Sequence, residues 1–168
     1  LALPIAIVGS QFALNLLSEI TTRARFPDPL PRMDFSAGIP ADCATLVVIP
    51  CLLTSREIID RLLNQLEVCH LGNTQPYVYF ALLTDFQDNP SRHHPADAEL
   101  LAYAIQQIHA LNNRYLGQEA PLFSLFHRAR EFNRQQGVWM GYERKRGKLQ
   151  ALNRWLRGDK SGFTHSVG

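Results

Sequence analysis

Positively charged side chains gather in one part of the 168-residue chain, between His127 and Arg157. This stretch contains nine Lys or Arg residues and two acids, a net charge of +7, while the whole chain carries only +2. The rest of the chain is therefore net acidic, and the basic character is local. Arginine presents a planar fork that matches phosphate oxygens, and lysine presents a mobile point charge. The stretch thus indicates an anionic partner, with a diphosphate as the first candidate.

The densest group of charges is the segment WMGYERKRGK (139–148), which contains Arg144, Arg146 and Lys148. The segment lacks the Gly-x-x-x-x-Gly-Lys-[Ser/Thr] frame, which excludes a Walker P-loop. The sequence predicts a final helix over 148–156. We therefore expect Lys148 in the first turn of that helix, where unpaired backbone N–H groups favour anions.

Two other interpretations of segment 139–148 stay open. One is a solvated basic face, in which Trp139 and Tyr142 are core or rim aromatics. The other is a nucleic-acid-binding module that uses residues 144–148 for phosphates and the two aromatics for stacking. The acidic remainder of the chain and the lack of an RNA-binding signature disfavour nucleic acid as the partner.

Alternating strand and helix patterns provide the scaffold for these charges. Continuous apolar runs, typical of strands covered on both faces, occur at 45–50, 77–83 and 122–126. Helical patterns occupy 54–66 and 95–115 between them. Connections of this length imply parallel strands and right-handed crossovers. We predict an α/β fold, a three-layer, Rossmann-like nucleotide-binding half-domain with a mainly parallel sheet. The last residues before Gly168 are interpreted as a loop.

Polar residues follow the predicted strands at their carboxyl ends, where ligands bind in open parallel sheets. The three places are residues 50–55, then Thr84, Asp85 and Asp88, and then His127, Arg128 and Arg130. The Asp85 carboxylate can accept hydrogen bonds from a base N–H or a ribose hydroxyl, or it can cap the turn that follows it. Asp85 and Asp88 alone do not make a metal site, so no metal ligand is assigned.

The chain divides into a helix at 1–25, a Pro-rich linker at 26–43 and a nucleotide-binding half-domain at 44–168. Gln11, Asn15 and Glu19 recur every four residues on one helical face. The apolar run beside them falls short of the roughly 20 residues that span a bilayer. We expect an amphipathic helix on a membrane surface or against other helices, with an ordinary surface helix as the alternative.

Several stretches together resemble a known family, the glycosyltransferase domain of bacterial cyclic β-1,2-glucan synthases. They are LPRMDFSAGIP (30–40), TLVVIPCLLTS (45–55), FALLTDFQD (80–88), LFHRAREFN (125–133) and WMGYERKRGKLQALNRWLRG (139–158). The resemblance covers nearly the whole chain, although Phe132 and Tyr142 stand where the family has Trp. It implies the N-terminal half of a GT-A fold of the processive family-2 kind. It also implies an inverting, membrane-associated enzyme that builds cyclic β-1,2-glucan from UDP-glucose.

The resemblance also implies roles for particular residues. Asp85 is similar to the strand-end carboxylate that recognises uridine, and Lys148 to the lysine that approaches the diphosphate. Arg128 matches a basic residue after the third strand. Thr84, Arg144 and Arg146 complete the expected substrate-binding set. Tyr115, just after the long helix, is a possible hydroxyl acceptor on which the glucan starts; the alternative is a partly buried tyrosine at a helix end.

Other parts of the family pattern lie outside residues 1–168. The family's Asp-x-Asp, which binds a divalent metal (Mg or Mn), and its later catalytic carboxylate are both missing from this stretch. No catalytic residue is therefore assigned here, and residues 1–168 alone are expected to be inactive. The expected partners are UDP-glucose, a β-1,2-glucan acceptor and a membrane, with the catalytic domain on the cytoplasmic face of the bacterial inner membrane. An inactive scaffold is the remaining alternative.

Overall fold

The computed structural model describes residues 2–25, 34–115 and 120–168. The chain forms two compact units, Leu1–Asp34 and Phe35–Gly168. The prolines Pro27, Pro29 and Pro31 of the predicted linker lie outside the described residues. The linker's last residues form a short 3-10 helix, η1 (Ala41–Cys43), within the second unit.

The first unit contains the helix α1 (Ala2–Ala24), and its side chains from Pro4 onward are exposed. The predicted helix is thus confirmed. Its segment Pro4–Ala24, with 21 residues and a mean hydropathy of 1.2, is long and apolar enough to cross a membrane. The apolar run was expected from the sequence to be too short to cross a membrane. Judged by length and composition, that expectation was wrong. The few polar side chains did not lower the mean hydropathy enough to exclude it.

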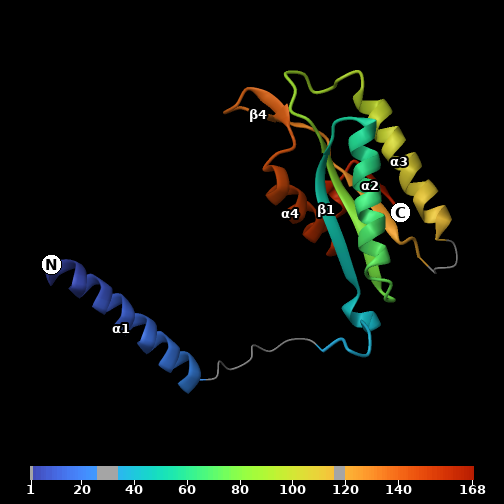
Figure 1. The fold of residues 1–168 in the computed structure, drawn as a ribbon. Coiled ribbons are helices and arrows are strands. Elements are labelled where there is room, and N and C mark those ends of the chain that lie inside the picture. Colours follow the sequence, from blue (N-terminus) through green and yellow to red (C-terminus); the bar gives the residue numbers. More distant parts are fainter. Residues whose placement is uncertain (1, 26–33, 116–119) are drawn as a thin grey trace. The chain divides into compact units, whose positions relative to one another are not determined.

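The second unit is built on a mixed, mostly parallel sheet (Figure 1). Its strands lie in the order β1 (Thr45–Leu53), β2 (Val78–Phe86), β3 (Phe123–His127) and β6 (His165–Val167). The first three are parallel, and β6 is antiparallel to β3. The helices α2 (Arg56–Leu71) and α3 (Asp97–Arg114) provide the two crossovers. The predicted α/β class and parallel core are confirmed.

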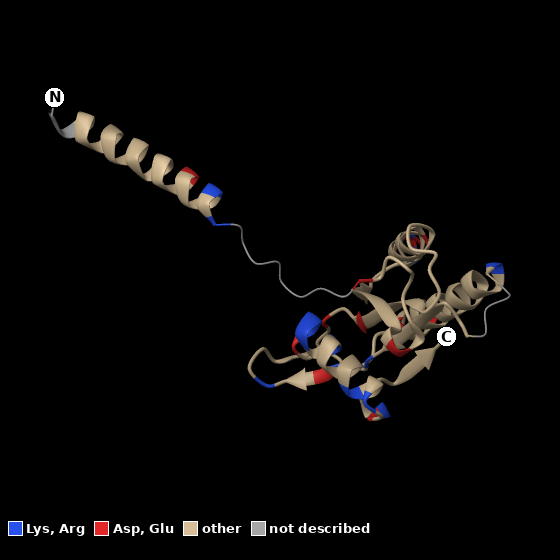
Figure 2. Cartoon of the chain, turned by 90° about the horizontal axis from the view of Figure 1, so that it is seen from below, with Lys and Arg blue, Asp and Glu red and all other residues tan. Residues whose placement is uncertain are grey.

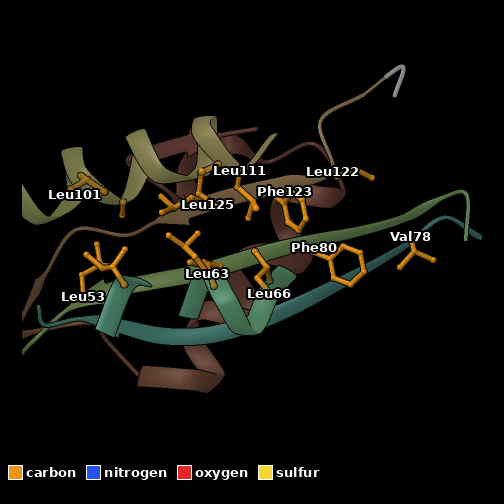
Figure 3. Close-up of a cluster of buried hydrophobic side chains, with 14 residues drawn as sticks. Leu53, Leu63, Leu66, Val78, Phe80, Leu101, Leu111, Leu122, Phe123 and Leu125 are labelled. Carbon is orange, nitrogen blue, oxygen red and sulfur yellow. The ribbon is translucent and has the colours of Figure 1, made fainter. Parts of the chain in front are cut away.

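Helices cover both faces of the sheet, which gives the predicted three layers (Figure 1). Alternate β2 residues explain this: Phe80 and Leu82 belong to the apolar cluster with α2 and α3, whereas Ala81 and Leu83 pack with α4 (Arg144–Leu156). Figure 3 shows the first cluster, in which leucines of both helices meet the aromatic rings of the sheet. Each fully buried Leu or Phe side chain contributes about 1.5–3 kcal/mol, so this interior holds the strand ends in place.

The strands run about three residues past their predicted ends at 50 and 83. The ladder continues through the pairs Cys51↔Thr84 and Leu52↔Asp85. Asp85 therefore belongs to β2 and does not follow it. The prediction stopped where the apolar run stopped, but backbone pairing does not require apolar side chains. Within β1, Pro50 lacks an N–H, which suits its place on an edge strand of the sheet.

Two short strand pairings were not predicted from the sequence. A hairpin joins β4 (Glu131–Asn133) to β5 (Val138–Met140), with Gly137 at φ +67° in its turn. The residues before Gly168 were interpreted as a loop, but β6 pairs with β3 after a short 3-10 helix, η2 (Lys160–Gly162). Strands of three residues are too short to show a period-2 pattern, and tertiary pairing decides their conformation.

Candidate functional site

Asp85 lies near the carboxyl end of β2, on the face covered by α4, and is 1% exposed. Arg128, just after β3, holds its carboxylate with two hydrogen bonds, from Nε to Oδ1 at 2.9 Å and from Nη2 to Oδ2 at 2.8 Å. Lys148 Nζ lies 3.3 Å from Oδ2. The structure thus brings together three of the predicted site residues. We call Asp85, Arg128 and Lys148 the Asp85 cluster.

Lys148 reaches this cluster from the second turn of α4. The expectation that it occupies the first turn of a helix over 148–156 was wrong, because α4 begins at Arg144. Its ammonium points to the strand ends and donates to the carbonyl oxygen of Cys51 at 2.5 Å. Lys148 is 3% exposed. Its contribution is therefore a buried side-chain charge and not a place at a helix N-terminus.

Two glycines allow α4 and the preceding turn to approach the Asp85 cluster. A Cβ on Gly141 would lie 2.2 Å from Asp85 Oδ2. A Cβ on Gly147 would lie 2.3 Å from the Tyr142 carbonyl oxygen and 2.8 Å from Arg128 Nη1. Neither distance is possible for a real side chain. Gly147 therefore permits close packing inside the helix.

The turn between these glycines has an unusual backbone. Glu143 and Arg144 both have positive φ values, +53° and +44°, and each such non-glycine residue costs about 1–2 kcal/mol. Arg128 stabilises the turn, because its Nη2 donates to the carbonyl oxygens of Tyr142 and Arg144, both at 3.3 Å. One guanidinium thus fixes both Asp85 and the turn that leads into α4.

The other predicted substrate-binding residues lie around the cluster or away from it. Arg144 pairs with Asp88 at 2.6 Å, and Arg146 pairs with Glu143; both arginines are exposed. Thr84 is buried on the opposite face of the sheet from Asp85. Its hydroxyl lies 2.9 Å from His127 Nδ1 and 3.3 Å from the Phe126 carbonyl oxygen. Successive strand residues alternate in direction, so Thr84 cannot share the face of Asp85.

Tyr115 lies at the other end of the sheet. Its ring is 5.6 Å from that of Phe123, the first residue of β3. Phe123 pairs with Phe80, so Asp85 lies five residues further along β2, roughly 16 Å at 3.3 Å per residue. The Tyr115 hydroxyl donates to Glu67 at 2.9 Å, which raises the pKa of that hydroxyl. A priming role for Tyr115 stays a prediction.

A second buried ion pair, between Arg130 and Asp97, was not predicted. Arg130 is 5% exposed and donates to both carboxylate oxygens of Asp97 and to the carbonyl oxygens of Gln87 and Arg92. Burial opposes ionisation of Asp97, but hydrogen bonds from Arg130 and the His94 N–H lower its pKa overall. This pair clamps the loop that follows β2. The sequence marked Arg130 as a strand-end cation but gave no signal for a partner 33 residues away.

The charge of the Asp85 cluster favours an anion. Two cations face one carboxylate, which leaves a net charge of +1 among side chains that are 12%, 4% and 1% exposed. Burial also raises the pKa of the neighbouring Cys51 thiol to about 12, so it adds no negative charge. A cavity of about 130 Å³ lies beside the Arg130–Asp97 pair and is lined by that pair with Leu53, Thr54 and Asp88, but by no member of the Asp85 cluster.

The described residues do not fit a metal ion. Among them, no group of three or more His, Cys, Asp or Glu side chains is placed to hold one. The Asp85 carboxylate is engaged by Arg128 and Lys148, and Asp88 by Arg144. The two buried cations around Asp85 are suited to the binding of an anionic group.

Similarity to a known protein agrees with the resemblance found in the sequence. No protein-family model matches the chain. Over 155 residues, 92% of the chain, it is 44% identical to the cyclic β-(1,2)-glucan synthase NdvB of Rhizobium meliloti (strain 1021). The predicted resemblance to this kind of synthase is thus confirmed. The chain spans 6% of the length of that relative.

Proposed function

We propose that this chain provides the donor-binding half of a glucosyltransferase that builds β-1,2-glucan from UDP-glucose. The observation that carries the proposal is the buried net charge of +1 at the carboxyl ends of the parallel strands. A diphosphate supplies the missing negative charge. The 44% identity to a cyclic β-(1,2)-glucan synthase supports glucose transfer as the use of that site.

Each member of the Asp85 cluster has a separate role in this proposal. Lys148 and Arg128 bind the diphosphate, and their positive charge stabilises the negative charge that develops on UDP as it leaves. The diphosphate competes with Asp85 for Lys148. Once Lys148 binds the diphosphate, the Asp85 carboxylate accepts hydrogen bonds from the uridine. The ion pairs between these side chains thus hold the site closed until the donor replaces them.

The reaction would exchange one bond at the glucose anomeric carbon for another. An acceptor hydroxyl oxygen bonds to that carbon while the bond to the diphosphate oxygen breaks, in line and with inversion. The hydroxyl proton passes to a base outside residues 1–168, and UDP leaves with the electron pair. The proposal includes a GT-A fold for the complete domain. It also includes a divalent metal, Mg or Mn, whose ligands lie outside the described residues and which would supply further positive charge.

The same proposal assigns the protein to a membrane. The segment Pro4–Ala24 is long and apolar enough to cross one. We place the half-domain on the cytoplasmic face of the bacterial inner membrane. Nucleic acid is not adopted as a partner, because the 44% identity is to a glucan synthase.

The substitution Lys148→Met in the intact protein tests the donor site. It removes the ammonium but keeps an apolar stem of similar volume, and Asp85 keeps its two bonds to Arg128. We expect transfer from radiolabelled UDP-glucose to fall about 100-fold, the loss of roughly 3 kcal/mol of transition-state stabilisation. The thermal unfolding midpoint should change by only a few degrees.

The matched control is Lys145→Met, which removes an exposed lysine three residues earlier with no ion-pair partner among the described side chains. It should leave transfer within about twofold, as surface charges contribute little. Wild-type transfer in Lys148→Met, or an equal loss in Lys145→Met, contradicts the donor site. No transfer in the unaltered protein would favour the inactive scaffold.

A further inference from the structure

The hairpin β4–β5 presents aromatic side chains where polar ones are expected. Phe132 and Trp139 face each other across the two strands, with ring centroids 5.5 Å apart. Phe132 is 50% exposed. On the opposite side of the hairpin, Met140 is 3% exposed, so that side already supplies the buried contact. The outer face of such a hairpin is normally polar, and an aromatic pair there points to a binding role.

The hairpin is also held in a fixed place beside the Asp85 cluster. Trp139 exchanges two backbone hydrogen bonds with Asn89, in the loop after β2, both at 2.9 Å. Immediately after β5, Gly141 packs on Asp85 and Tyr142 accepts a hydrogen bond from Arg128. Tyr142 is itself 50% exposed. Figure 1 shows the hairpin at the carboxyl end of the sheet, away from the amino ends of the strands.

The chemistry of this surface fits a neutral saccharide. A pyranose ring has an apolar face of C–H groups that packs on an aromatic ring, and a rigid aromatic contributes this contact area at little entropic cost. The two rings carry no charge, which suits the apolar face of a neutral ligand better than a polyanion. Arg92 lies over Trp139 at 5.6 Å and leaves the more exposed ring, Phe132, as the open part of the pair.

We propose that Phe132 and Trp139 form a platform that binds a glucose unit of the β-1,2-glucan acceptor. This inference rests on the proposed function, and it names the surface that would hold the acceptor next to the donor site. The platform binds the chain by stacking, and the Asp85 cluster binds the donor by charge. The two contributions can therefore be separated by substitution.

The test is the affinity of the intact protein for a β-1,2-linked gluco-oligosaccharide, measured by calorimetry without UDP-glucose. Phe132→Ala should raise the Kd roughly fivefold or more, the effect of losing one aromatic stacking contact. Phe132→Tyr keeps an aromatic ring and should restore wild-type affinity, whereas Phe132→Leu keeps only apolar volume and should not. Leu156→Ala, which removes an apolar side chain of α4 that is 57% exposed, is the control and should bind as wild type.

The aromatic platform and the donor site are tested by different measurements, oligosaccharide affinity for the first and glucosyl transfer for the second. Oligosaccharide affinity that is unchanged in Phe132→Ala, or restored by Phe132→Leu, overturns the platform. No oligosaccharide binding, or tighter binding of single-stranded RNA, overturns it as well. Undiminished glucosyl transfer in Lys148→Met overturns the donor site instead, whatever the oligosaccharide affinity.

Discussion

Burial of the Asp85 carboxylate is possible because both of its oxygens have charged donors. Oδ1 accepts from Arg128, and Oδ2 lies against both Arg128 and Lys148. A buried carboxylate without such partners would lose several kcal/mol of solvation. The same contacts leave one positive charge in excess, so the residues that stabilise the unliganded site also prepare it for an anion.

Gly141 provides a direct test of this packing. The substitution Gly141→Ala places a Cβ 2.2 Å from Asp85 Oδ2, so the carboxylate or the turn must shift. We expect a loss of about 2–4 kcal/mol in the free energy of unfolding, measured with urea. The control is Gly72→Ala, whose Cβ would meet its nearest neighbour at 3.6 Å, an ordinary contact. Equal stability of the two variants would show that the turn does not pack on Asp85.

His127 predicts a pH dependence of stability. Burial lowers the pKa of its imidazole to about 4 from the usual value of 6.5. Between these values the unfolded chain binds a proton that the folded chain does not, so stability falls as pH falls from about 6.5 toward 4. This residue alone should contribute a loss of roughly 3 kcal/mol.

The variant His127→Asn tests that prediction, because its amide can still donate to Thr84 but does not titrate. Urea unfolding at pH 7 and pH 4.5 should show a much smaller pH effect in this variant than in the wild type. His109→Asn, on the exposed side of α3, serves as the control and should keep the wild-type pH effect. A wild-type pH effect in His127→Asn would contradict a buried neutral imidazole.

At the scale of the element, α4 shows what sequence patterns could and could not predict. Its existence was predicted, but its start was placed four residues late, at Lys148 instead of Arg144. The contacts that require glycine at position 147 involve the turn just before the helix, through the Tyr142 carbonyl, and the distant Arg128 side chain. The three parallel strands were predictable because their interiors are continuously apolar. Their polar last residues were not, since only the ladder defines them.

The sequence could also predict part of the candidate site. The rule that ligands bind at strand ends selected Asp85 and Arg128 from the sequence. Lys148 was selected by the basic run and by the family resemblance. Alternation along β2 would also have separated Thr84 from Asp85, had it been applied to the strand end. The pairing of Arg130 with Asp97 has no local signature. It arises because the loop after β2 folds back on the end of β3.

The loop clamp formed by Arg130 and Asp97 can be measured with a double-mutant cycle. Arg130→Met or Asp97→Asn alone leaves an uncompensated charge on a side chain that is at most 13% exposed. We expect each single variant to lose about 3–5 kcal/mol of unfolding free energy. The double variant should lose clearly less than the sum, with a coupling of about 2 kcal/mol or more.

The exposed pair of Arg56 with Glu99 is the matched control for this cycle, since its side chains are 54% and 67% exposed. Its coupling should not exceed about 1 kcal/mol, the usual range for surface pairs. Equal coupling in the two cycles would mean that Arg130 does not clamp the loop.

At the scale of the whole molecule, the chain combines a folded α/β unit with a helix that has little polar surface. The cationic residues of the folded unit lie mainly on α4 and the segments around it, as Figure 2 shows. The apolar clusters of the second unit are built around its own residues, such as Phe80 and Leu83. We therefore expect folding of the half-domain to depend on the second unit, and the proposed membrane contact to depend on the first.

Removal of residues 1–34 tests this separation. The remaining unit, Phe35–Gly168, keeps its apolar clusters and its buried ion pairs. We expect its thermal unfolding midpoint to stay within a few degrees of that of the whole chain, measured by circular dichroism.

In flotation with phosphatidylcholine vesicles, the whole chain should rise with the lipid, and the shortened chain should not. The reason is that each exposed apolar side chain of α1 gains about 1.5–3 kcal/mol on leaving water. Phe12→Asp should weaken flotation, whereas Gln11→Ala, at a polar position of the same helix, should preserve it. Flotation of the shortened chain would place the membrane contact in the α/β unit, and loss of its folding would show that the two units depend on each other.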